Sequence, residues 1–255
     1  MWLKWIKLCL LALTFCIGKA EAQVVNTERL RLNADSNGWF GDADLAFSFI
    51  KVNNPLFRMV MNGQTVFRQD HHQVFFVGNM QLIKSPGQSF ANSGFFHTRY
   101  QNPADKRLMF EAFHQAQYNR LLKVKFRNLL GAGGRLELLD TANTNKLFLG
   151  ATLMHEYEVL DGEEKDNNDL RWSYYIAHRV KLFDRMAWNG TMYYQPLLGI
   201  AADYRLSLEN AILVDITSQI QFKFDIQLFY DSRPPVGVTK DTYAVTNGIR
   251  YKFRK

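Results

Sequence analysis

Long runs in which apolar and polar residues alternate one by one recur through most of the chain after residue 38. The clearest run is QIQFKFDIQLFY at 219–230. Successive side chains of a β-strand point to opposite faces, so such a run gives a strand one apolar face and one polar face. In this run the apolar face holds Ile220, Phe222, Phe224, Ile226, Leu228 and Tyr230. The chain is therefore predicted to be all-β.

The strand signals predict about twelve strands in the chain. They cover residues 40–52, 56–68, 73–84, 90–101, 107–118, 121–129, 146–159, 170–182, 185–195, 203–214, 219–230 and 242–253. The runs at 170–182, 219–230 and 242–253 exceed the roughly 5–6 residues typical of strands in soluble proteins. They match the roughly 9–11 tilted residues with which a strand crosses a bilayer.

The alternation alone fits two environments. In a soluble periplasmic β-barrel or sandwich that binds an apolar ligand, the apolar face points inward. In an outer-membrane barrel the apolar face meets lipid. Strand length favours the membrane, and so does the alternation of long and short connections in the second half of the chain. The long connections are 161–169, 195–203 and 231–241, and the short ones are 140–145, 183–185 and 214–217.

We therefore predict an up-and-down antiparallel transmembrane β-barrel of roughly 12 strands. Lipid offers no hydrogen-bond partner to the backbone, so a sheet that crosses it must have no free edge. The last strand, 242–253, is accordingly expected to pair with the first, 40–52.

The first residues, MWLKWIKLCLLALTFCIGKAEA, have the layout of a secretory signal peptide. The apolar run within them is too short for a spanning helix. We predict a signal peptide at 1–22, a lead segment at 23–38 and one barrel domain at 39–255, located in a bacterial outer membrane. Both cysteines of the chain, Cys9 and Cys16, would leave with the signal. The exported protein would then hold no disulfide.

The closing stretch, YAVTNGIRYKFRK at 243–255, alternates like a strand and brings an aromatic side chain at Phe253. A final strand with a terminal aromatic is typical of chains that the β-barrel assembly machinery recognises. Phe253 is therefore the candidate assembly signal. Arg254 and Lys255 depart from that pattern, because the aromatic residue is not the last one.

On the polar faces, charges of opposite sign fall on neighbouring predicted strands, where they can pair across the barrel wall. Two interpretations stay open. One is a structural polar network that fills a narrow interior, and the other is a weakly cationic pore that favours small anions or polar solutes. The lumen-lining candidates are Lys123, Lys125, Arg127, Glu156, Glu158, Arg171, Arg179, Lys181, Lys223 and Arg250.

Several short motifs resemble binding sites but favour structural interpretations. In Asp70–His72 the two histidines are adjacent, so on a strand they would point to opposite faces instead of sharing a metal. GAGG at 131–134 is not followed by a helical period, and a bend or bulge in a curved strand is expected there. DGEEKDNND at 161–169 lacks the ligand spacing of an EF-hand and is expected to be a solvated outer loop.

Three histidines, His114, His155 and His178, fall on the apolar faces of predicted strands. An outer-membrane hydrolase would need a histidine near a nucleophilic serine, and the chain contains no His-x-Ser sequence. The histidines are expected to be residues at the rim of the barrel. We expect no catalytic residue, no metal, no cofactor and no enzymatic activity.

Three segments carry a resemblance to a known family: NTERLRLNADSNGWFGDADLAFSF at 26–49, GAGGRLEL at 131–138 and NGIRYKF at 247–253. Through them the chain resembles the YdiY-like family of salt-induced outer-membrane proteins, a family of unknown function. The resemblance implies an outer-membrane β-barrel. It implies no catalytic residue and no particular substrate.

The expected function is passive passage of small solutes or a structural, stress-related role in the envelope. The soluble apolar-ligand binder is the competing class, and an outer-membrane hydrolase is a third. Expected partners are outer-membrane lipid, the β-barrel assembly machinery and a small polar solute. The formal charge of +7 is spread without a long cationic run, so nucleic acid is not an expected partner.

Overall fold

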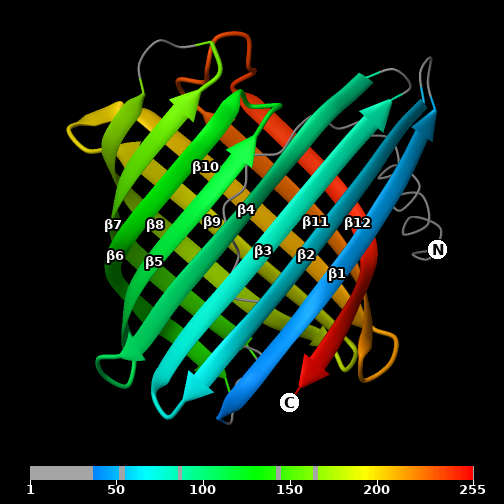
Figure 1. Cartoon of the computed structure of the whole chain (residues 1–255). Coiled ribbons are helices and arrows are strands. Elements are labelled where there is room, and N and C mark those ends of the chain that lie inside the picture. Colours follow the sequence, from blue (N-terminus) through cyan, green and yellow to red (C-terminus); the bar gives the residue numbers. More distant parts are fainter. Residues whose placement is uncertain (1–36, 52–54, 86–87, 142–144, 163–165, 255) are drawn as a thin grey trace, which may run out of the picture.

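The protein is a closed barrel of twelve antiparallel strands (Figure 1). The computed structural model describes residues 37–51, 55–85, 88–141, 145–162 and 166–254. Each strand pairs with its neighbours in sequence, and β12 closes the ring on β1. The strands are β1 (Gly38–Lys51), β2 (Pro55–Gln69), β3 (His72–Ser85), β4 (Gln88–Pro103), β5 (Leu108–Asn119), β6 (Val124–Thr141), β7 (Asn145–Leu160), β8 (Asn167–Phe183), β9 (Met186–Leu197), β10 (Ile200–Asp215), β11 (Ile220–Asp231) and β12 (Asp241–Arg254).

The predicted number of strands, their up-and-down order and the closure of the last strand on the first are confirmed. The predicted signal peptide at 1–22 lies outside the described residues, as does most of the lead segment at 23–38. We call the end of the barrel where β11 connects to β12 the outer end. The inner end is the one where β12 finishes (Figure 1).

The prediction of a long loop at 195–203 is wrong. Only Leu198 and Gly199 separate β9 from β10. Gly199 has a φ of 83°, a conformation that glycine adopts without steric cost. The β9–β10 ladder then shifts register between Ile200 and Tyr204. The residues between these two positions therefore belong to an irregular part of β10 and not to a loop.

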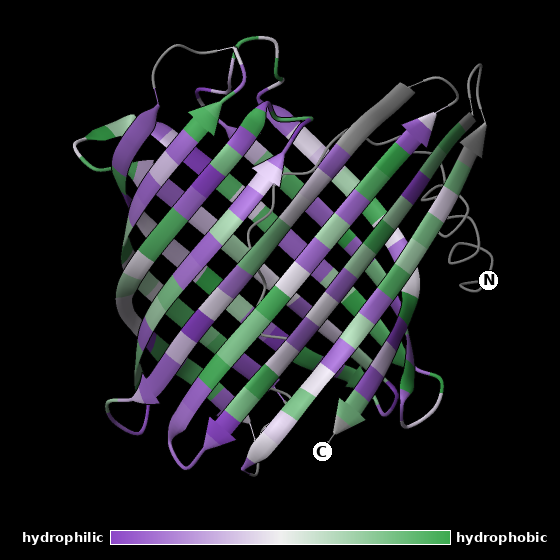
Figure 2. Ribbon diagram, in the orientation of Figure 1, coloured by the Kyte–Doolittle hydropathy of each residue, from purple (hydrophilic) through white to green (hydrophobic). Residues whose placement is uncertain are grey.

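Large apolar side chains cover the outside of the barrel, while along each strand they alternate with polar residues that face inward (Figure 2). Phe47 and Phe49 on β1 expose 72% and 68% of their surfaces, whereas Asp42 and Asp44 on the opposite face are buried. A soluble barrel or sandwich would bury its apolar face. The arrangement argues against the soluble alternative and matches a barrel set in lipid. The described residues include no helix with the length and apolar character needed to cross a membrane.

Aromatic side chains on the outside gather in rows near both ends. Near the inner end, Trp39 lies 5.0 Å from Phe67 and 6.3 Å from Phe76, measured between ring centroids. Near the outer end, a row crosses β8 to β11 with successive centroids 5.6 to 6.5 Å apart. It consists of Trp172, Tyr174, Tyr194, Tyr204 and Tyr230. Such girdles mark the two membrane interfaces of transmembrane barrels.

The seam between β1 and β12 is closed by backbone pairing and by charge. Phe40–Leu45 pair with Ile249–Arg254 in antiparallel register. Inside the barrel, Arg250 Nε donates to Asp44 Oδ1 at 2.8 Å. Lys223 Nζ on β11 lies 3.4 Å from Asp44 Oδ2. The closing strand is therefore held to the first strand by buried ion pairs as well as by the ladder.

On the outside of the same seam, the ring of Phe253 lies directly over Gly41 of β1. A side chain at position 41 would collide with that ring. Ile249 and Tyr251 face outward with Phe253, and Arg250 faces inward. Phe253 thus packs on the first strand, within the stretch where the described residues of β1 and β12 pair.

An arginine placed at Phe224, on the outward face of β11, is expected to destabilise the folded barrel by about 2–4 kcal/mol because it would sit in hydrocarbon. Phe224→Leu is the matched control and should cost clearly less. Urea unfolding in lipid vesicles, followed by tryptophan fluorescence, measures both. Equal costs would contradict the lipid-facing assignment. Lys223 is no neutral control, since its loss would leave the carboxylates of Asp44 and Asp225 without their shared cation.

Replacing Arg250 by Met is expected to cost about 3 kcal/mol, because it removes the cation that lies between the buried carboxylates of Asp42 and Asp44 and leaves Asp44 with Lys223 alone. Arg250→Lys keeps the charge and should cost less. The additional change Asp44→Asn should recover part of the loss. Unfolding free energies of the three variants test this; equal costs of Met and Lys at position 250, with no recovery by Asp44→Asn, would argue for packing alone.

Replacing Phe253 by Ala is expected to lower the amount of assembled barrel, as judged by the different gel mobility of unboiled and boiled samples. The ring that covers Gly41 would be lost together with the candidate assembly signal. Removal of Arg254 and Lys255 is the control and should leave assembly intact. Normal assembly of Phe253→Ala would mean that this stretch is only a strand.

Candidate functional site

The candidate site is the polar interior, and its densest part lies near the outer end. Arg127 on β6 and Arg171 on β8 flank Glu156 on β7, with N–O distances of 3.0 and 2.8 Å. Arg127 Nε also donates to Glu158 at 2.6 Å. Arg205 on β10 contacts both glutamates. Arg127, the two glutamates and Arg171 lie on the neighbouring strands β6, β7 and β8, so the sign of the charge alternates from strand to strand. Arg205 comes from β10, which is not adjacent to β7.

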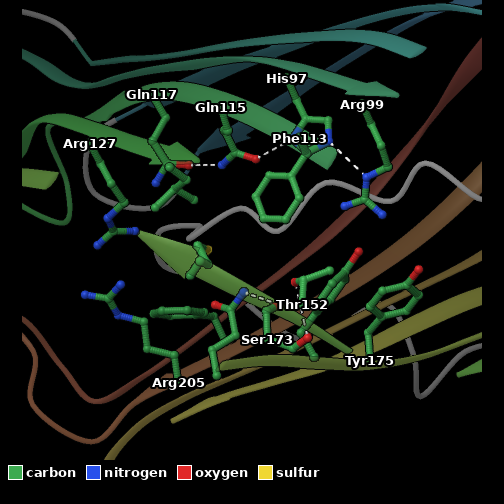
Figure 3. A pocket seen from close by; sticks show the side chains of 15 residues that line it. His97, Arg99, Phe113, Gln115, Gln117, Arg127, Thr152, Ser173, Tyr175 and Arg205 are labelled. Atoms are coloured by element: carbon green, nitrogen blue, oxygen red, sulfur yellow. Dashed lines mark hydrogen bonds between the residues drawn. The ribbon is translucent and has the colours of Figure 1, made fainter. Parts of the chain in front are cut away.

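Several contacts join strands that are not neighbours in the wall. Arg205 reaches Glu156 across β9 and β8, which separate their strands. Tyr175 on β8 donates its hydroxyl to Glu111 on β5 at 2.6 Å, with β7 and β6 between them. Figure 3 shows Arg127 and Arg205 projecting from different strands into the same space. The interior is therefore bridged by side chains at two levels.

Glu111 is the centre of the second level and has no exposed surface. Arg99 Nη1 lies 3.4 Å from Glu111 Oε2, and Gln101 donates to Oε1. Arg135 lies 3.9 Å from the same carboxylate, and its guanidinium stacks 3.4 Å above the ring centroid of Phe148. A buried carboxylate is tolerated when cations and donors surround it. The charge of Glu111 is thus compensated within the protein, by two arginines and by hydrogen bonds from Gln101 and Tyr175.

Between the two levels lies a cavity of about 40 Å³ (Figure 3). Side chains from β4 to β11 line it, among them the hydrogen-bonded row His97, Gln115 and Gln117. Because one water occupies roughly 10–15 Å³ on this measure, the cavity has room for about three waters. In this conformation the middle of the barrel is filled by side chains.

The buried charges of the interior nearly cancel. Among the described residues with buried side chains there are seven cations and nine anions. The cations are Arg99, Arg127, Arg135, Arg171, Arg205, Lys223 and Arg250, and the anions are Asp42, Asp44, Glu111, Glu156, Glu158, Asp203, Glu209, Asp225 and Asp231. The half-buried Arg58, Arg68 and Arg179 offset the small acidic excess. Together these side chains form an interior of paired charges whose net charge is close to zero.

The loop between β11 and β12 extends across the outer mouth to the far wall. Lys123 Nζ, in the turn between β5 and β6, donates to the carbonyl of Val236 at 2.6 Å. Val238 packs against a buried apolar cluster beside that turn. The cluster consists of Leu122, Val124 and Leu160. These strands lie on opposite sides of the ring from β11 and β12, so the loop covers part of the mouth.

The structure places most of the predicted lumen residues inside. Six of them are buried in the interior: Arg127, Glu156, Glu158, Arg171, Lys223 and Arg250. Arg179 is half-buried near the inner end of β8. Lys181 differs from the prediction, because it lies at the end of β8 with an exposed side chain 3.2 Å from Asp184. Alternation fails there because the β8–β9 ladder shifts register between Lys181 and Phe183, where β8 ends.

Lys123 and Lys125 also lie outside the lumen, contrary to the sequence analysis. Lys123 is in the mouth turn, and Lys125 is an exposed residue paired with Asp161 at 3.1 Å. The cause is a register shift. Val124 pairs with Leu160 and Phe126 pairs with Val159, so β6 advances by two residues while β7 advances by one. A bulge reverses the alternation, so Val124 turns inward and Phe126 outward.

The sequence analysis missed several interior residues that prove central. They are His97, Arg99, Glu111, Arg135 and Arg205. Each lies at an alternating position of a predicted strand except Arg135, which lies beyond the predicted end of its strand at residue 129. For the other four, the alternation did indicate an inward position, because each is a polar residue next to an apolar or aromatic residue that faces outward. Strand alternation does not show which strands contact one another across the lumen.

The histidines of the motifs considered above make hydrogen bonds with exposed neighbouring side chains. His72 Nδ1 contacts the hydroxyl of Tyr100 at 2.7 Å on the exposed surface. His155 faces outward beside Asn168, at 2.6 Å. The part of the chain that the structure describes contains no group of three His, Cys, Asp or Glu residues placed to hold a metal. Residues 163–165 of the acidic loop lie outside that part.

Of the bend or bulge expected at GAGG, 131–134, the bulge is absent. These residues pair in regular register with both neighbouring strands. A side chain at Gly131 would collide with the ring of Phe113, and one at Gly133 with the backbone of Ala151. The glycines therefore allow close packing at the wall, and the bulges of β6 lie to either side of them.

Two solved structures share this fold. The NanC porin is 8% identical and covers 84% of this chain and 100% of its own, with a TM-score of 0.51. An outer-membrane channel from Pseudomonas putida F1 is 10% identical and covers 91% of this chain and 100% of its own, with a TM-score of 0.54. At such identities the likeness concerns the fold alone. No curated protein matches the chain.

A family model described as "Protein of unknown function, DUF481" matches residues 43–253. The match begins in β1 and ends in β12, so it covers the whole ring of strands. It agrees with the resemblance to the YdiY-like outer-membrane proteins. The chain belongs to the DUF481 family.

Proposed function

We propose that this protein resides in the bacterial outer membrane, placed there by the β-barrel assembly machinery, and acts as a gated passage for small polar solutes of little net charge. The observation that carries the proposal is the polar interior. Along the barrel, charged and amide side chains face one another across the lumen. Such groups can exchange partners with water or a solute at little net change in hydrogen bonding.

The described conformation is the closed one in this proposal. Arg205 and Tyr175 bridge the interior, and the β11–β12 loop is fastened to the far wall by Lys123 and Val238. The contacts described for this fastening are a lysine hydrogen bond and a half-buried valine. Contacts of that kind contribute about 1 and 1.5 kcal/mol. An equilibrium held by so few contacts opens often enough for slow passage.

A structural role in the envelope is the second candidate, and the filled interior favours it. A 40 Å³ cavity passes no solute without rearrangement. Paired charges that only fill space would give a rigid barrel in which the lumen never opens. The two candidates differ in one measurable property, namely whether the purified barrel conducts.

Planar-bilayer recording of the folded protein tests the proposal. We expect rare openings for the natural chain. The variant Lys123→Ala with Val238→Ser should open about tenfold more often or more, since roughly 2 kcal/mol of fastening would be lost. Lys125→Ala, which removes an exposed lysine from the same region, should change nothing. A barrel that stays silent in all three forms would overturn the passage and favour the structural role.

Ion selectivity tests the charge balance separately. Because the interior cations and anions nearly cancel, the reversal potential under a salt gradient is expected to lie near zero. The control is the double change Glu156→Gln and Glu158→Gln, which should shift the open lumen toward anions. Strong anion selectivity of the natural chain would contradict the balance described for its side chains.

A further inference from the structure

An apolar groove of about 420 Å³ crosses the outward face of β3 to β6 (Figure 1). Its volume lies in the range of small-molecule sites. Small residues, Gly94 and Ala116, leave the surface hollow between four exposed side chains, which are Met80, Phe96, Tyr118 and Phe126. The other lining residues are Lys125 and three inward neighbours in the same strands, Asn79, Phe95 and Gln117. We call this feature the outer groove.

The outer groove begins close to the outer end of the barrel. Tyr118 lies one residue before the end of β5, and its hydroxyl donates to Asn92 Oδ1 at 2.9 Å. A Cβ atom at Gly94 would lie 3.0 Å from the tyrosine ring, so the glycine lets the ring lie close against β4. A tyrosine with an apolar ring and a bonded hydroxyl suits the boundary between hydrocarbon and water. The groove therefore leads from the outer interface into the lipid-facing band.

The rim of the barrel beside this groove is basic. Segments 82–94 and 116–126 contain four cations and no acidic residue. The cations are Lys84, Arg120, Lys123 and Lys125. Lys123 is engaged with the carbonyl of Val236, whereas the other three are exposed. Within the part of the chain that the structure describes, the side chains of Lys84 and Arg120 have no ion-pair partner. Such a local excess of one sign attracts anions.

Lys125 joins the basic rim to the groove, because it lines the groove and also pairs with Asp161 at 3.1 Å. Both side chains of that pair are more than half exposed, and exposed pairs contribute little to stability. A phosphate can therefore replace the aspartate at small cost. Arg120 belongs to the same turn, and its backbone N–H donates to the carbonyl of Asn92 at 3.2 Å. The turn is thus fastened to β4 beside Tyr118.

The combination of groove and rim selects the kind of occupant. A lipid without net charge would fill the groove and leave the cations unmatched. A soluble anion would match the cations and leave the apolar walls uncovered. A lipid with phosphate on its head group satisfies both parts, since basic residues at a membrane surface favour anionic head groups and a charged donor binds phosphate strongly.

We propose that the outer groove binds a phosphorylated acyl glycolipid of the outer leaflet. One acyl chain lies over Ala116 between Phe96 and Phe126, and a phosphate is bound by Lys125 and Arg120. The inference rests on the membrane location proposed above and not on solute passage. In a planar bilayer of phosphatidylcholine, which offers no such head group, loss of Lys125 leaves conduction as it was, and a barrel that never conducts leaves the lipid site standing.

Native mass spectrometry of the folded full chain in detergent, titrated with diphosphorylated lipid A, tests the head-group site. The variant Arg120→Gln with Lys125→Gln should weaken binding about tenfold or more. Lys181→Gln with Arg185→Gln is the matched control, because it removes two exposed cations around the β8–β9 turn at the inner end; it should change nothing. Undiminished binding by the first variant would overturn the site.

The same lipid without its phosphates separates charge from apolar contact. Dephosphorylated lipid A should bind equally to the natural chain and to the variant that lacks Arg120 and Lys125, because only the groove then contributes. Its affinity for the natural chain should be lower than that of the phosphorylated lipid. If the variant weakened binding of both lipids to the same extent, the two cations would have no role in recognising phosphate and the proposal would fail.

Filling the groove tests its apolar part. Ala116→Phe places a ring beside Phe96, which pairs with position 116, and should weaken binding of both lipids. Ala132→Phe is the matched control, because Ala132 is an exposed outward residue of β6 that does not line the groove. Gel mobility before boiling checks that each variant is folded. Equal binding by the two variants would overturn the acyl-chain site.

The same spectra show whether a second copy of the chain takes the place of the lipid. The natural chain is expected to keep the mass of a monomer when no lipid is added. A dimer that forms without lipid and disappears in Ala116→Phe would assign the outer groove to contact between copies and would overturn the lipid site.

Discussion

A sheet in hydrocarbon must pair every backbone N–H and C=O within the protein, and the rest of this structure depends on that constraint. It requires the twelve strands to close, and closure requires β12 to meet β1 although 190 or more residues lie between them. The pairing is supported from both sides. Arg250 and Asp44 hold it from within, and Phe253 covers Gly41 from outside. The closed sheet then has an outer face toward lipid and an inner face toward the lumen.

Closure with twelve strands creates an interior that is too wide for wall residues to fill with short side chains. The chain fills it with arginine, glutamate, glutamine and tyrosine, which are long enough to meet across the space. Long polar side chains bring charge, and charge in a narrow space must be compensated. Arg205 between Glu156 and Glu158, and Glu111 between Arg99 and Arg135, are two solutions to this requirement. The near balance of interior charge is a consequence of packing as much as of any selectivity.

Much of this architecture is visible in the sequence because strand alternation is local. Ile220 to Tyr230 show their faces without knowledge of any partner, and the position of Arg250 follows from the same period. The failures have equally physical causes. The bulge between Val124 and Phe126 reverses the period within β6, so Lys125 was assigned to the wrong face. The tight turn at Leu198 and Gly199 resembles a loop because the irregular start of β10 lacks alternation.

Contacts across the lumen are of another kind. Arg205 and Glu156 are 49 residues apart on strands that are not neighbours, and their meeting depends on the circumference and stagger of the whole barrel. No local pattern contains those quantities. The same reasoning applies to the seam: alternation predicts that β1 and β12 pair, but it does not predict where the pairing ends. That endpoint depends on how strand lengths and register accumulate around twelve strands, so it is a property of the closed ring and of no single segment.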